Sequence, residues 1–355
     1  MKTVGQITLS RRRLLGGALV AAFVPLVGCN DASSSRTNAD PNAPVSVRVA
    51  FFPNITHAAA LYGTGTGTFQ KAFGETATIK EVVFTAGPSE IEALFASEVD
   101  LGYIGPGPAL NGYLKSKGDA LQIVAGAASG GVSLVSRADV SIKTIADLAG
   151  KTVAAPQKGG TQDLSLRHAI SEAGLKPKEK GGNVTVVDFA PADILTQFQR
   201  KTIDAAWIPE PWVTRLEKEV GAKIVADERT LWKTGTFSTA VVIVRSAFLK
   251  EHPELVATFV AAHKAVVAEI AANPEEARKV IGERIKTLNS GKAIPDDVLK
   301  TALERTEITA DPLQESVLTF ADWSREAGYI REDRSALSGL FADIPAPKGD
   351  TGGAK

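Results

Sequence analysis

The sequence predicts an α/β fold in two lobes. From residue 45 to residue 245, strand-like segments alternate with segments of helical periodicity, which is typical of α/β proteins with mainly parallel sheets. About 300 residues have the composition of a folded chain, and a body of that size usually divides into two domains or lobes. A helix-strand-helix pattern near residue 100 recurs near residue 204, so each lobe is predicted to hold one of two related units.

Strand predictions in the first part of the chain rest on alternation and on β-branched residues. Residues 45–52 read Val-Ser-Val-Arg-Val-Ala-Phe-Phe and open the fold. Glycine and proline behind the later strands predict turns, and Ser89 is a candidate cap for one of the helices that follow. The next predicted strands are 80–85, 100–104, 121–127 and 132–136, and the predicted helices are 90–97 and 109–115.

The alternation continues through the middle of the chain and then gives way to helices. The predicted elements are a short helix 142–148, strand 151–155, a glycine-containing loop 157–162, helix 163–173, strand 184–189, helix 193–201, strand 203–208, helix 212–220 and strand 223–226. After a strand at 241–245, apolar residues follow helical spacing. The helices predicted there are 253–272, 275–285, 296–306, 313–327 and 334–341.

The two related units share an order of features. Each has a helix, a strand that begins with aspartate, an aromatic residue, and a proline-containing turn before the next helix. The strands begin at Asp100 and Asp204, and the aromatic residues are Tyr103 and Trp207. In open α/β sheets ligands bind beyond the carboxyl ends of the strands. Both turns occupy that position, so we expect them to face each other across a cleft. Chance similarity between α/β units is the alternative.

Composition excludes several classes of function. The 355 residues include 40 basic and 40 acidic side chains, a balance that does not favour nucleic-acid binding or a general attraction to membranes. The 4 histidines show no metal-ligand spacing, no Gly-x-Ser-x-Gly elbow is present, and the acidic residues form no diagnostic pair. No metal, cofactor or catalytic site is therefore predicted.

The amino-terminal segment predicts export and a lipid anchor. An arginine cluster at residues 11–13 precedes an apolar stretch of about fifteen residues, which is too short to span a bilayer and is typical of a secretory signal. Residues 26–29, Leu-Val-Gly-Cys, resemble a bacterial lipobox, which implies a signal peptide over 1–28 and lipidation of Cys29. Residues 10–15 resemble a twin-arginine export motif, and an uncleaved anchor is the alternative. Residues 29–44 have the composition of a flexible tether, and 346–355 that of a disordered tail.

Four segments together resemble the solute-binding proteins of ABC importers in the nitrate, sulfonate and taurine family. They are residues 52–58 (Phe-Pro-Asn-Ile-Thr-His-Ala), 100–106, 159–161 and 207–212 (Trp-Ile-Pro-Glu-Pro-Trp). The resemblance covers most of the chain, from about residue 45 to about residue 345. It implies an α/β, two-lobed, periplasmic-binding-protein-like (type II) fold with a ligand cleft between the lobes.

The family pattern also implies where the lobes begin and end. Lobe 1 would comprise residues 45–135 and 236–345, and lobe 2 residues 136–235, with crossings near 130–135 and 236–241. The chain departs from the family at residues 63–68, where glycine alternates with threonine. Because each glycine costs a helix about 1 kcal/mol relative to alanine, the first helix is predicted to be frayed or broken.

Anion binding is predicted at two helix starts. Gly105 and Pro106 precede one helix, and Gly160 and Thr161 precede another. Exposed N–H groups and the positive end of the helix dipole favour anions at such positions. Thr161 adds a hydroxyl donor, and Lys158 adds a positive charge nearby. For the glycine loop, a tight turn without ligand contact is the alternative.

Polar residues behind the first strand and behind the second related unit are further candidates for ligand contact. The side chains of Asn54, Thr56 and His57 follow the first strand, where an ordinary helix cap is the alternative. Glu210 is unfavourable beside an anion. We expect it to pair with Lys158, with an amide at a crossing, or with an amine on the ligand, and an amine would favour a taurine-like ligand.

Aromatic side chains and crossing residues complete the candidate set. Tyr103, Trp207 and Trp212 are candidates for the pocket wall, although buried aromatic residues more often belong to the core. The remaining candidates are hydroxyl residues near the two crossings, namely Ser129, Ser238 and Thr239.

The resemblance implies a monomeric, lipid-anchored protein on the outer face of the cytoplasmic membrane. It would capture a small organic anion and deliver it to an ABC importer, made of a permease and its cytoplasmic ATPase. An aliphatic sulfonate is the first expectation, and nitrate, taurine, bicarbonate and a thiamine-precursor pyrimidine are the alternatives. Pyrimidine-precursor synthases resemble the same family, but they are cytosolic and need a cofactor or a histidine-rich site. A sensor domain is a third reading, and no signalling module follows in the sequence.

Overall fold

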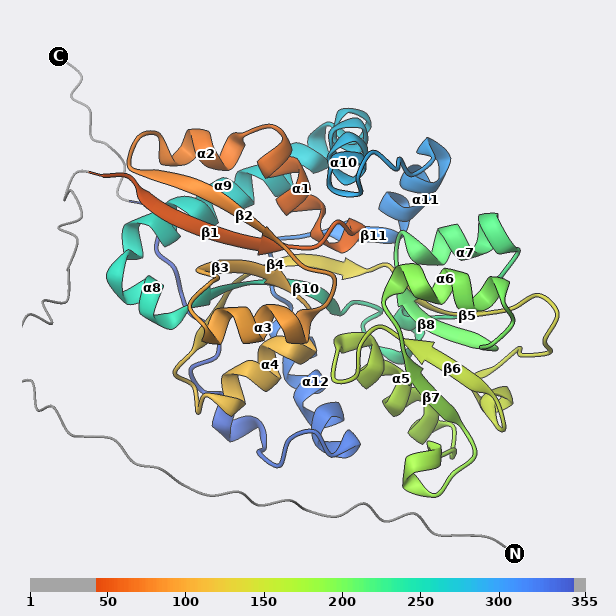
Figure 1. Cartoon of the computed structure of the whole chain (residues 1–355). Coiled ribbons are helices and arrows are strands. Elements are labelled where there is room, and N and C mark those ends of the chain that lie inside the picture. Colours follow the sequence, from red (N-terminus) through yellow and green to blue (C-terminus); the bar gives the residue numbers. More distant parts are fainter. Residues whose placement is uncertain (1–42, 348–355) are drawn as a thin grey trace, which may run out of the picture. The chain divides into compact units, whose positions relative to one another are not determined.

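Two mixed β-sheets form the framework of the computed structural model, which describes residues 43–347 (Figure 1). The first sheet has 6 strands in the order β11-β4-β10-β3-β1-β2, and the second has 5 in the order β7-β6-β8-β5-β9. The first sheet contains β1 (Val45–Phe51), β2 (Ala77–Val83), β3 (Leu101–Ile104), β4 (Leu121–Gly130), β10 (Ser238–Arg245) and β11 (Thr306–Ile308). The second contains β5 (Val132–Ser136), β6 (Thr152–Ala155), β7 (Thr185–Asp188), β8 (Ala205–Pro209) and β9 (Lys223–Asp227). The predicted signal peptide, Cys29 and nearly all of the predicted tether and tail lie outside the described residues.

Helices surround both sheets at the places where the periodicity predicts them. The α-helices are α1 (Ala58–Gly65), α2 (Thr68–Phe73), α3 (Gly87–Phe95), α4 (Pro106–Lys115), α5 (Thr161–Glu172), α6 (Pro191–Gln199), α7 (Trp212–Val220), α8 (Ser246–Glu251), α9 (Pro253–Ala272), α10 (Pro274–Leu288), α11 (Asp296–Arg305) and α12 (Gln314–Ala327). The short 3-10 helices are η1 (Ile55–His57), η2 (Ile145–Leu148), η3 (Lys178–Lys180), η4 (Glu228–Leu231) and η5 (Arg334–Leu337).

The prediction of mainly parallel sheets is wrong. In the first sheet β1 pairs in parallel with β2 and β3, but β10 is antiparallel to both β3 and β4. The second sheet repeats this mixture, because β6 is parallel to β7 and β8 whereas β5 is antiparallel to β8 and β9. Parallel neighbours need a crossover connection. The strands β5 and β10 arrive from the other sheet instead, and they run against their neighbours.

The related units predicted from the sequence occupy equivalent positions in the two sheets. β3 and β8 each lie between a parallel and an antiparallel neighbour. The N–H of Arg245 donates to the carbonyl of Asp100 over 2.8 Å, and the N–H of Arg137 donates to that of Asp204 over 3.0 Å. Each aspartate carboxylate also accepts an N–H from the neighbouring parallel strand. The repeated hydrogen bonds confirm the relationship between the units.

The glycine-rich segment behind the first strand divides one predicted helix into two. α1 continues to Gly65, and the break falls at Gly67, which has a left-handed φ of 69°. A Cβ atom at Gly63 would lie 2.3 Å from the ring of Phe69. The absence of a side chain at Gly63 therefore lets the aromatic ring of the second helix lie against the first.

Four other helix predictions need correction. Ser89 is not a cap, because α3 begins at Gly87 behind Ala86, and Pro88 occupies its first turn. α4 and α5 also begin earlier than predicted, at Pro106 and Thr161, and proline at the first position suits a helix start because its φ is already helical. The predicted last helix is only the turn η5, because the chain then pairs with β4 at Phe341.

The chain passes between the sheets at two adjacent places. β4 ends at Gly130 and β5 begins at Val132, with left-handed φ angles of 70° and 69° at Gly130 and Gly131. The returning segment enters β10 at Ser238, and the Thr239 hydroxyl donates to the carbonyl of Gly130 over 2.7 Å. The two crossings are thus tied to each other. The lobe limits of 45–135 with 236–345, and of 136–235, stay a prediction.

Two helices of the carboxyl-terminal part have contrasting roles. α9 is long and apolar enough to span a membrane by length and composition, but half of its apolar window is buried, and its Phe259 ring lies 4.8 Å from that of Phe69. It is a core helix of the first sheet. α12 contacts elements from both halves, because Trp323 stacks on His168 of α5 at 4.1 Å and the Ser324 hydroxyl lies 3.2 Å from Asn111 Oδ1 of α4.

Candidate functional site

A small cavity of about 60 Å³ lies where the two sheets face each other. Its lining residues follow the carboxyl ends of β1, β2 and β3 in the first sheet and of β6, β7 and β8 in the second. These are the positions at which open α/β sheets bind ligands. The lining consists of Phe52, Asn54, Thr85, Ala86, Gly87, Pro88, Gly105, Pro108, Pro156, Gln157, Gly160, Thr161, Gln162, Pro191 and Pro209.

Four helices begin at the wall of this cavity. α3, α4, α5 and α6 have 9, 10, 12 and 9 residues, and their first or capping residues are Gly87, Gly105, Gly160 and Pro191. In none of the four does the side chain of the capping residue bond to the helix start, but in α4 the N–H of Gly107 is bonded to the Thr161 hydroxyl and Pro106 and Pro108 have no N–H. The first N–H groups of a helix have no partner within the helix, and its amino-terminal end carries about half a positive charge. The cavity is therefore surrounded by positive helix ends, as predicted for two of them.

Thr161 joins the starts of α4 and α5. The N–H of Gly107 donates to the Thr161 hydroxyl over 3.1 Å, and the threonine is 3% exposed. A Cβ atom at Gly105 would lie 2.3 Å from the same hydroxyl oxygen. Glycine at this position therefore allows the two helix starts to meet. Since the Thr161 oxygen accepts this bond, its own proton stays available for a ligand at the wall.

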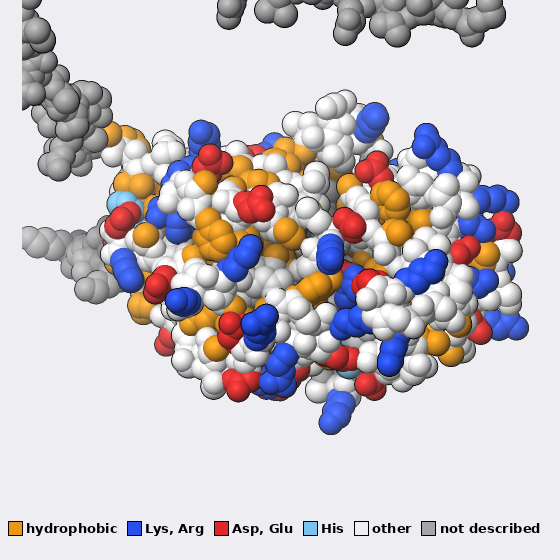
Figure 2. Space-filling model, turned by 60° about the horizontal axis from the view of Figure 1, so that its bottom comes forward, with side chains coloured by type: hydrophobic (Ala, Val, Ile, Leu, Met, Phe, Trp, Pro, Cys, Tyr) orange, Lys and Arg blue, Asp and Glu red, His pale blue; other side chains and the backbone are white. Residues whose placement is uncertain are grey.

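The cavity wall carries no charged side chain, which distinguishes it from the surface of the described part of the chain. Figure 2 shows basic and acidic side chains interspersed over the face that it presents. The polar side chains at the cavity are instead amides and hydroxyls. The Asn54 amide oxygen accepts the N–H of Thr56 over 3.1 Å, which leaves its NH₂ group as a donor. Gln157 lines the wall with a buried side-chain oxygen that has no hydrogen-bond partner within residues 43–347.

Thr56 and His57 belong to the support behind the first strand. The Thr56 hydroxyl lies 3.3 Å from the Asn54 amide oxygen. The N–H of Phe52 donates to His57 Nδ1 over 3.2 Å, and the two rings stack with centroids 4.3 Å apart. Burial lowers the pKa of His57 to about 3, so the ring is neutral and accepts this bond. The two side chains hold Asn54 and Phe52 at the wall, and neither belongs to the lining.

Tyr103 points into the core of the first sheet. Its hydroxyl lies 2.9 Å from His263 Nδ1 on α9, and His263 Nε2 lies 2.8 Å from the carbonyl of Gly126. Burial lowers the pKa of His263 to about 4. Because a carbonyl only accepts, Nε2 of the neutral ring carries the proton and Nδ1 accepts from the tyrosine. The sequence contained no signal for this partner, which is 160 residues away.

Trp207 is buried at the equivalent position in the second sheet. Its indole N–H donates to Glu228 Oε2 over 2.6 Å, and the Ser165 hydroxyl donates to Glu228 Oε1 over 2.6 Å. Burial raises the pKa of Glu228 to about 7, although both hydrogen bonds oppose the shift. Neither Tyr103 nor Trp207 lines the cavity.

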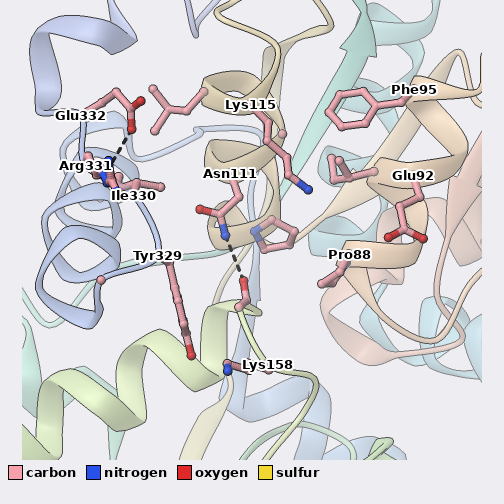
Figure 3. A pocket seen from close by; sticks show the side chains of 16 residues that line it. Pro88, Glu92, Phe95, Asn111, Lys115, Lys158, Tyr329, Ile330, Arg331 and Glu332 are labelled. Atoms are coloured by element: carbon pink, nitrogen blue, oxygen red, sulfur yellow. Dashed lines mark hydrogen bonds between the residues drawn. The ribbon is translucent and has the colours of Figure 1, made fainter. Parts of the chain in front are cut away.

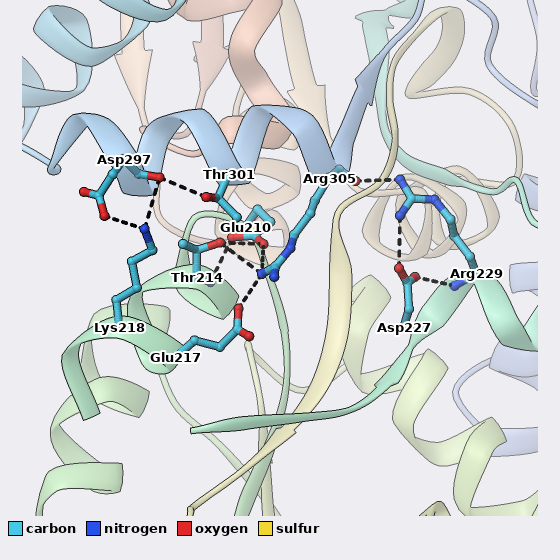
Figure 4. Close-up of polar contacts among 9 residues, drawn as sticks. All are labelled: Glu210, Thr214, Glu217, Lys218, Asp227, Arg229, Asp297, Thr301 and Arg305. Carbon is cyan, nitrogen blue, oxygen red and sulfur yellow. Dashed lines mark hydrogen bonds and ion pairs between the residues drawn. The ribbon is translucent and has the colours of Figure 1, made fainter. Parts of the chain in front are cut away.

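Glu210 is fully engaged beside the cleft. Its carboxylate accepts the N–H of Thr214 over 3.0 Å and the Thr214 hydroxyl over 2.9 Å, which caps α7. Arg305 of α11 lies 3.2 Å from the same carboxylate and also pairs with Glu217 (Figure 4). Burial raises the pKa of Glu210, and the Thr214 bonds and Arg305 oppose the shift. Glu210 therefore pairs with Arg305, and the expected pairing with Lys158 or with an amide at a crossing is not found in the described part of the chain.

Lys158 faces a separate groove of about 640 Å³ between α3, α4 and the segment behind α12 (Figure 3). The wall of the groove includes Phe95, Lys115 and Tyr329. The Asn111 amide also lines the groove and donates to the carbonyl of Gly159 over 3.3 Å. Lys158 lines this groove and not the cavity whose wall includes Gly160 and Thr161.

The other candidates also lie outside the cavity wall. Trp212 begins α7, and the guanidinium of Arg215 lies 4.5 Å from its ring centroid. Ser129 is buried in β4, where it pairs with Ser238 of β10 and with Glu307 of β11. Thr239 is engaged with Gly130, as described above. Pro106 starts α4 directly behind Gly105.

Sequence reasoning missed several wall residues. Thr85 ends a predicted strand, Gln157, Gln162 and Pro191 follow predicted strands, and the rule that ligands bind beyond strand ends pointed to them. The internal repeat directed attention to β3 and β8 instead. Within residues 43–347 no group of three or more His, Cys, Asp or Glu side chains is arranged to hold a metal ion.

The chain matches known proteins over most of its length. A protein of Brucella abortus, named as a binding protein, is 33% identical over 205 residues, which is 58% of this chain and 61% of that protein. The taurine-binding periplasmic protein of Escherichia coli is 28% identical over 274 residues, 74% of this chain and 81% of that one.

A solved structure shows the same fold. The periplasmic aliphatic sulphonate binding protein SsuA of Escherichia coli superposes with a TM-score of 0.69 at 20% identity, and covers 88% of this chain and 97% of that one. The match confirms the two-lobed, periplasmic-binding-protein-like α/β fold with its cleft between the lobes. The model of one family, described as the NMT1-like family, matches residues 40–286, which is more than half of the chain. This protein therefore belongs to the NMT1-like family.

Proposed function

We propose that this protein is the solute-binding component of an ABC importer and that it captures a small organic anion, with an aliphatic sulfonate as the first candidate. The observation that carries the proposal is the meeting of four helix starts at one cavity, with the Thr161 hydroxyl at the junction of two of them. Such helix starts bind anions without a basic side chain. The names of the relatives, which bind taurine or aliphatic sulphonates, support the same class of ligand.

The wall of the cavity favours a sulfonate over the smaller alternatives. A sulfonate head group offers three acceptor oxygens and a single negative charge. The Thr161 hydroxyl and the Asn54 amide are donors at the wall. The ring of Phe52 and the prolines around it supply apolar surface for a short tail. Nitrate and bicarbonate would use the donors and leave the apolar surface without a partner.

Binding without catalysis suits this wall better than an enzyme does. The cavity is lined by no histidine, cysteine, lysine or carboxylate among the described residues. Those groups supply nucleophiles and proton transfer in most active sites. The relatives named above are also binding proteins by name.

The cavity and its donors can be tested by titration calorimetry with ethanesulfonate. Thr161→Ala removes one hydrogen bond to a charged group, and we expect a loss of affinity of about ten- to hundredfold. Thr287→Ala is the matched control, because that exposed hydroxyl bonds only within its own helix. If ethanesulfonate, nitrate and taurine all fail to bind the wild-type protein, the proposed function is wrong. Equal affinities for wild type and Thr161→Ala would place the anion elsewhere.

We further propose that the protein acts outside the cytoplasm, attached to the membrane by a lipid on Cys29. The proposal rests on the lipobox-like residues 26–29, and the export of the chain by the twin-arginine route rests on residues 10–15. In a bacterial host, Cys29→Ser should move the protein from the carbonate-washed membrane fraction to the soluble fraction. A variant that stays in the washed membranes would refute the lipid anchor.

A further inference from the structure

The cavity offers no counter-ion for a positively charged group on the ligand. All 15 lining residues are uncharged, and five of them are prolines. The ends of four helices add positive partial charge around the same space. An ammonium group buried there would face repulsion from the helix ends and would lose its hydration without gaining an ionic partner.

Two acidic residues close to the lining segments in sequence, Asp163 and Glu210, are engaged elsewhere. Asp163 pairs with Arg167 at 2.8 Å and accepts the Tyr329 hydroxyl at 2.6 Å. Glu210 is held by α7 and Arg305, as described above. Each of these carboxylates would have to leave a buried partner in order to reach a ligand.

Asp193 in the first turn of α6 is exposed and absent from the cavity lining. Glu90 on α3 is another nearby acid, and it is also unsuited to an ammonium. It is fully buried, and a Cβ atom at Gly102 would lie 2.1 Å from its Oε1, which places the carboxyl against β3. Burial raises the pKa of Glu90 well above its ordinary value, which disfavours its charged form. It is also absent from the cavity lining.

Gln157 is a neutral residue at the cavity wall, where a carboxylate of the same shape would be a partner for an ammonium. It lines the cavity in the loop between β6 and α5, with a left-handed φ of 34°. Its buried side-chain oxygen has no partner within residues 43–347. Glutamate has the same shape, so the exchange of one amide nitrogen for an oxygen would place a carboxylate at this wall.

We infer that the cleft selects small anions that carry no ammonium group, and that the neutral Gln157 is a residue that determines this specificity. The inference rests on the proposed function and narrows its ligand class to simple sulfonates rather than taurine. The two compounds form a matched pair, because taurine is ethanesulfonate with an amino group on its second carbon.

Titration calorimetry with this pair tests the inference on the full-length wild type, Gln157→Glu and Gln199→Glu. We expect the wild type to bind ethanesulfonate at least about tenfold more tightly than taurine. Gln157→Glu should shift the ratio of the two affinities toward taurine by at least about tenfold, because it supplies a carboxylate. Gln199→Glu adds the same charge on the exposed end of α6 and should keep the wild-type ratio.

Each outcome decides one question. Wild-type affinity for taurine equal to or tighter than for ethanesulfonate overturns the inference and leaves the proposed function standing. An unchanged ratio in Gln157→Glu removes Gln157 as the determinant. If Gln157→Glu does not fold, as judged by its thermal unfolding, the wild-type ratio and Gln157→Ala still decide, since the alanine variant should keep the preference for ethanesulfonate. Binding of neither compound refutes the proposed function itself.

Discussion

Tyr103 and Trp207 occupy the same position in the two related units, but one forms a hydrogen bond to a base and the other to an acid. Tyr103 bonds to a neutral buried histidine, His263, and Trp207 bonds to a buried carboxyl, Glu228. Both aromatic side chains point away from the cavity. The repeated backbone therefore fixes the position of the residue, whereas the surrounding helices determine its chemistry. A repeat in sequence predicts equivalent strands more reliably than equivalent functions.

The turns behind the same two strands also differ in the residue that bonds to the start of the next helix. Gly105 and Pro209 are equivalent, and both line the cavity. Behind Gly105 the start of α4 is bonded by the Thr161 hydroxyl from the second sheet, whereas behind Pro209 the nearby side chain of Glu210 caps α7. Only the first unit therefore places a helix start in the cavity wall at this position. In the second sheet that role passes to α5, which follows β6.

The largest effect expected from this comparison concerns Glu228. Its pKa is about 7 in the folded protein against an ordinary value of 4.5. The folded state therefore holds a proton that the unfolded state has lost, and stability falls as the pH rises between these values. The loss is about 3 kcal/mol. Glu228→Gln should be about as stable as wild type at pH 4.5 and about 3 kcal/mol more stable at pH 8.

Urea unfolding of wild type and Glu228→Gln across this pH range measures the effect. Parallel stability curves for the two proteins would show that Glu228 is already ionised at low pH. His263 supplies the contrast, because a base whose folded pKa is lowered to about 4 loses stability as the pH falls below its ordinary value of 6.5. The contribution of Glu228 to the free energy of unfolding should thus fall as the pH rises, and that of His263 should fall as the pH is lowered.

The next effect tests the contact between the two helix starts. Gly105→Ala should lower the affinity for ethanesulfonate by about a hundredfold, because the new Cβ atom would lie 2.3 Å from the Thr161 oxygen and keep α4 from α5. The backbone angles at Gly105, φ −70° and ψ 151°, suit any residue, so the loss of stability, about 1–3 kcal/mol, should come from this contact alone. Calorimetry and thermal unfolding measure the two quantities. An alanine variant that binds as tightly as wild type would mean that the helix starts need not meet.

The smallest effect concerns the hydroxyl of Tyr103. Tyr103→Phe leaves the acceptor nitrogen of His263 buried without a donor, and we expect a loss of about 1–2 kcal/mol in the free energy of unfolding. The affinity for ethanesulfonate should stay within about twofold of wild type, a change of less than about 0.5 kcal/mol. A large loss of affinity with unchanged stability would instead place the tyrosine hydroxyl at the ligand.

The sequence predicts the strands and helices well but not the direction of every strand. Alternation and β-branched residues locate β1, β5 and β9 within about two residues, since these patterns arise from local burial. The antiparallel direction of β5 and β10 depends on how the chain connects the two sheets, and the local sequence of a strand does not determine that connection. The lobe limits stay a prediction for the same reason.

The candidate site shows a similar division between local and distant causes. Asn54, Gly105, Gly160 and Thr161 line the cavity, and each belongs to a strand end or helix start that can be recognised locally. Glu210 was expected near the ligand, but its partner Arg305 is 95 residues away in sequence. Such distant pairings decide which charged groups are free to bind a ligand, and a single sequence does not display them. Contact with ligand stays a prediction for all of these residues.

The position of α12 has a consequence for the dwell time of a ligand. This helix is fastened to α5 by the stacking of Trp323 on His168 and by the pair between His168 and Glu326 at 3.0 Å. It is also fastened to α4 by the bond between Ser324 and Asn111. Any movement that draws α5 away from α4 must first detach α12 from one of them. If the proposed ligand leaves by such a movement, its residence time should depend on contacts outside the cleft as well as on the binding wall.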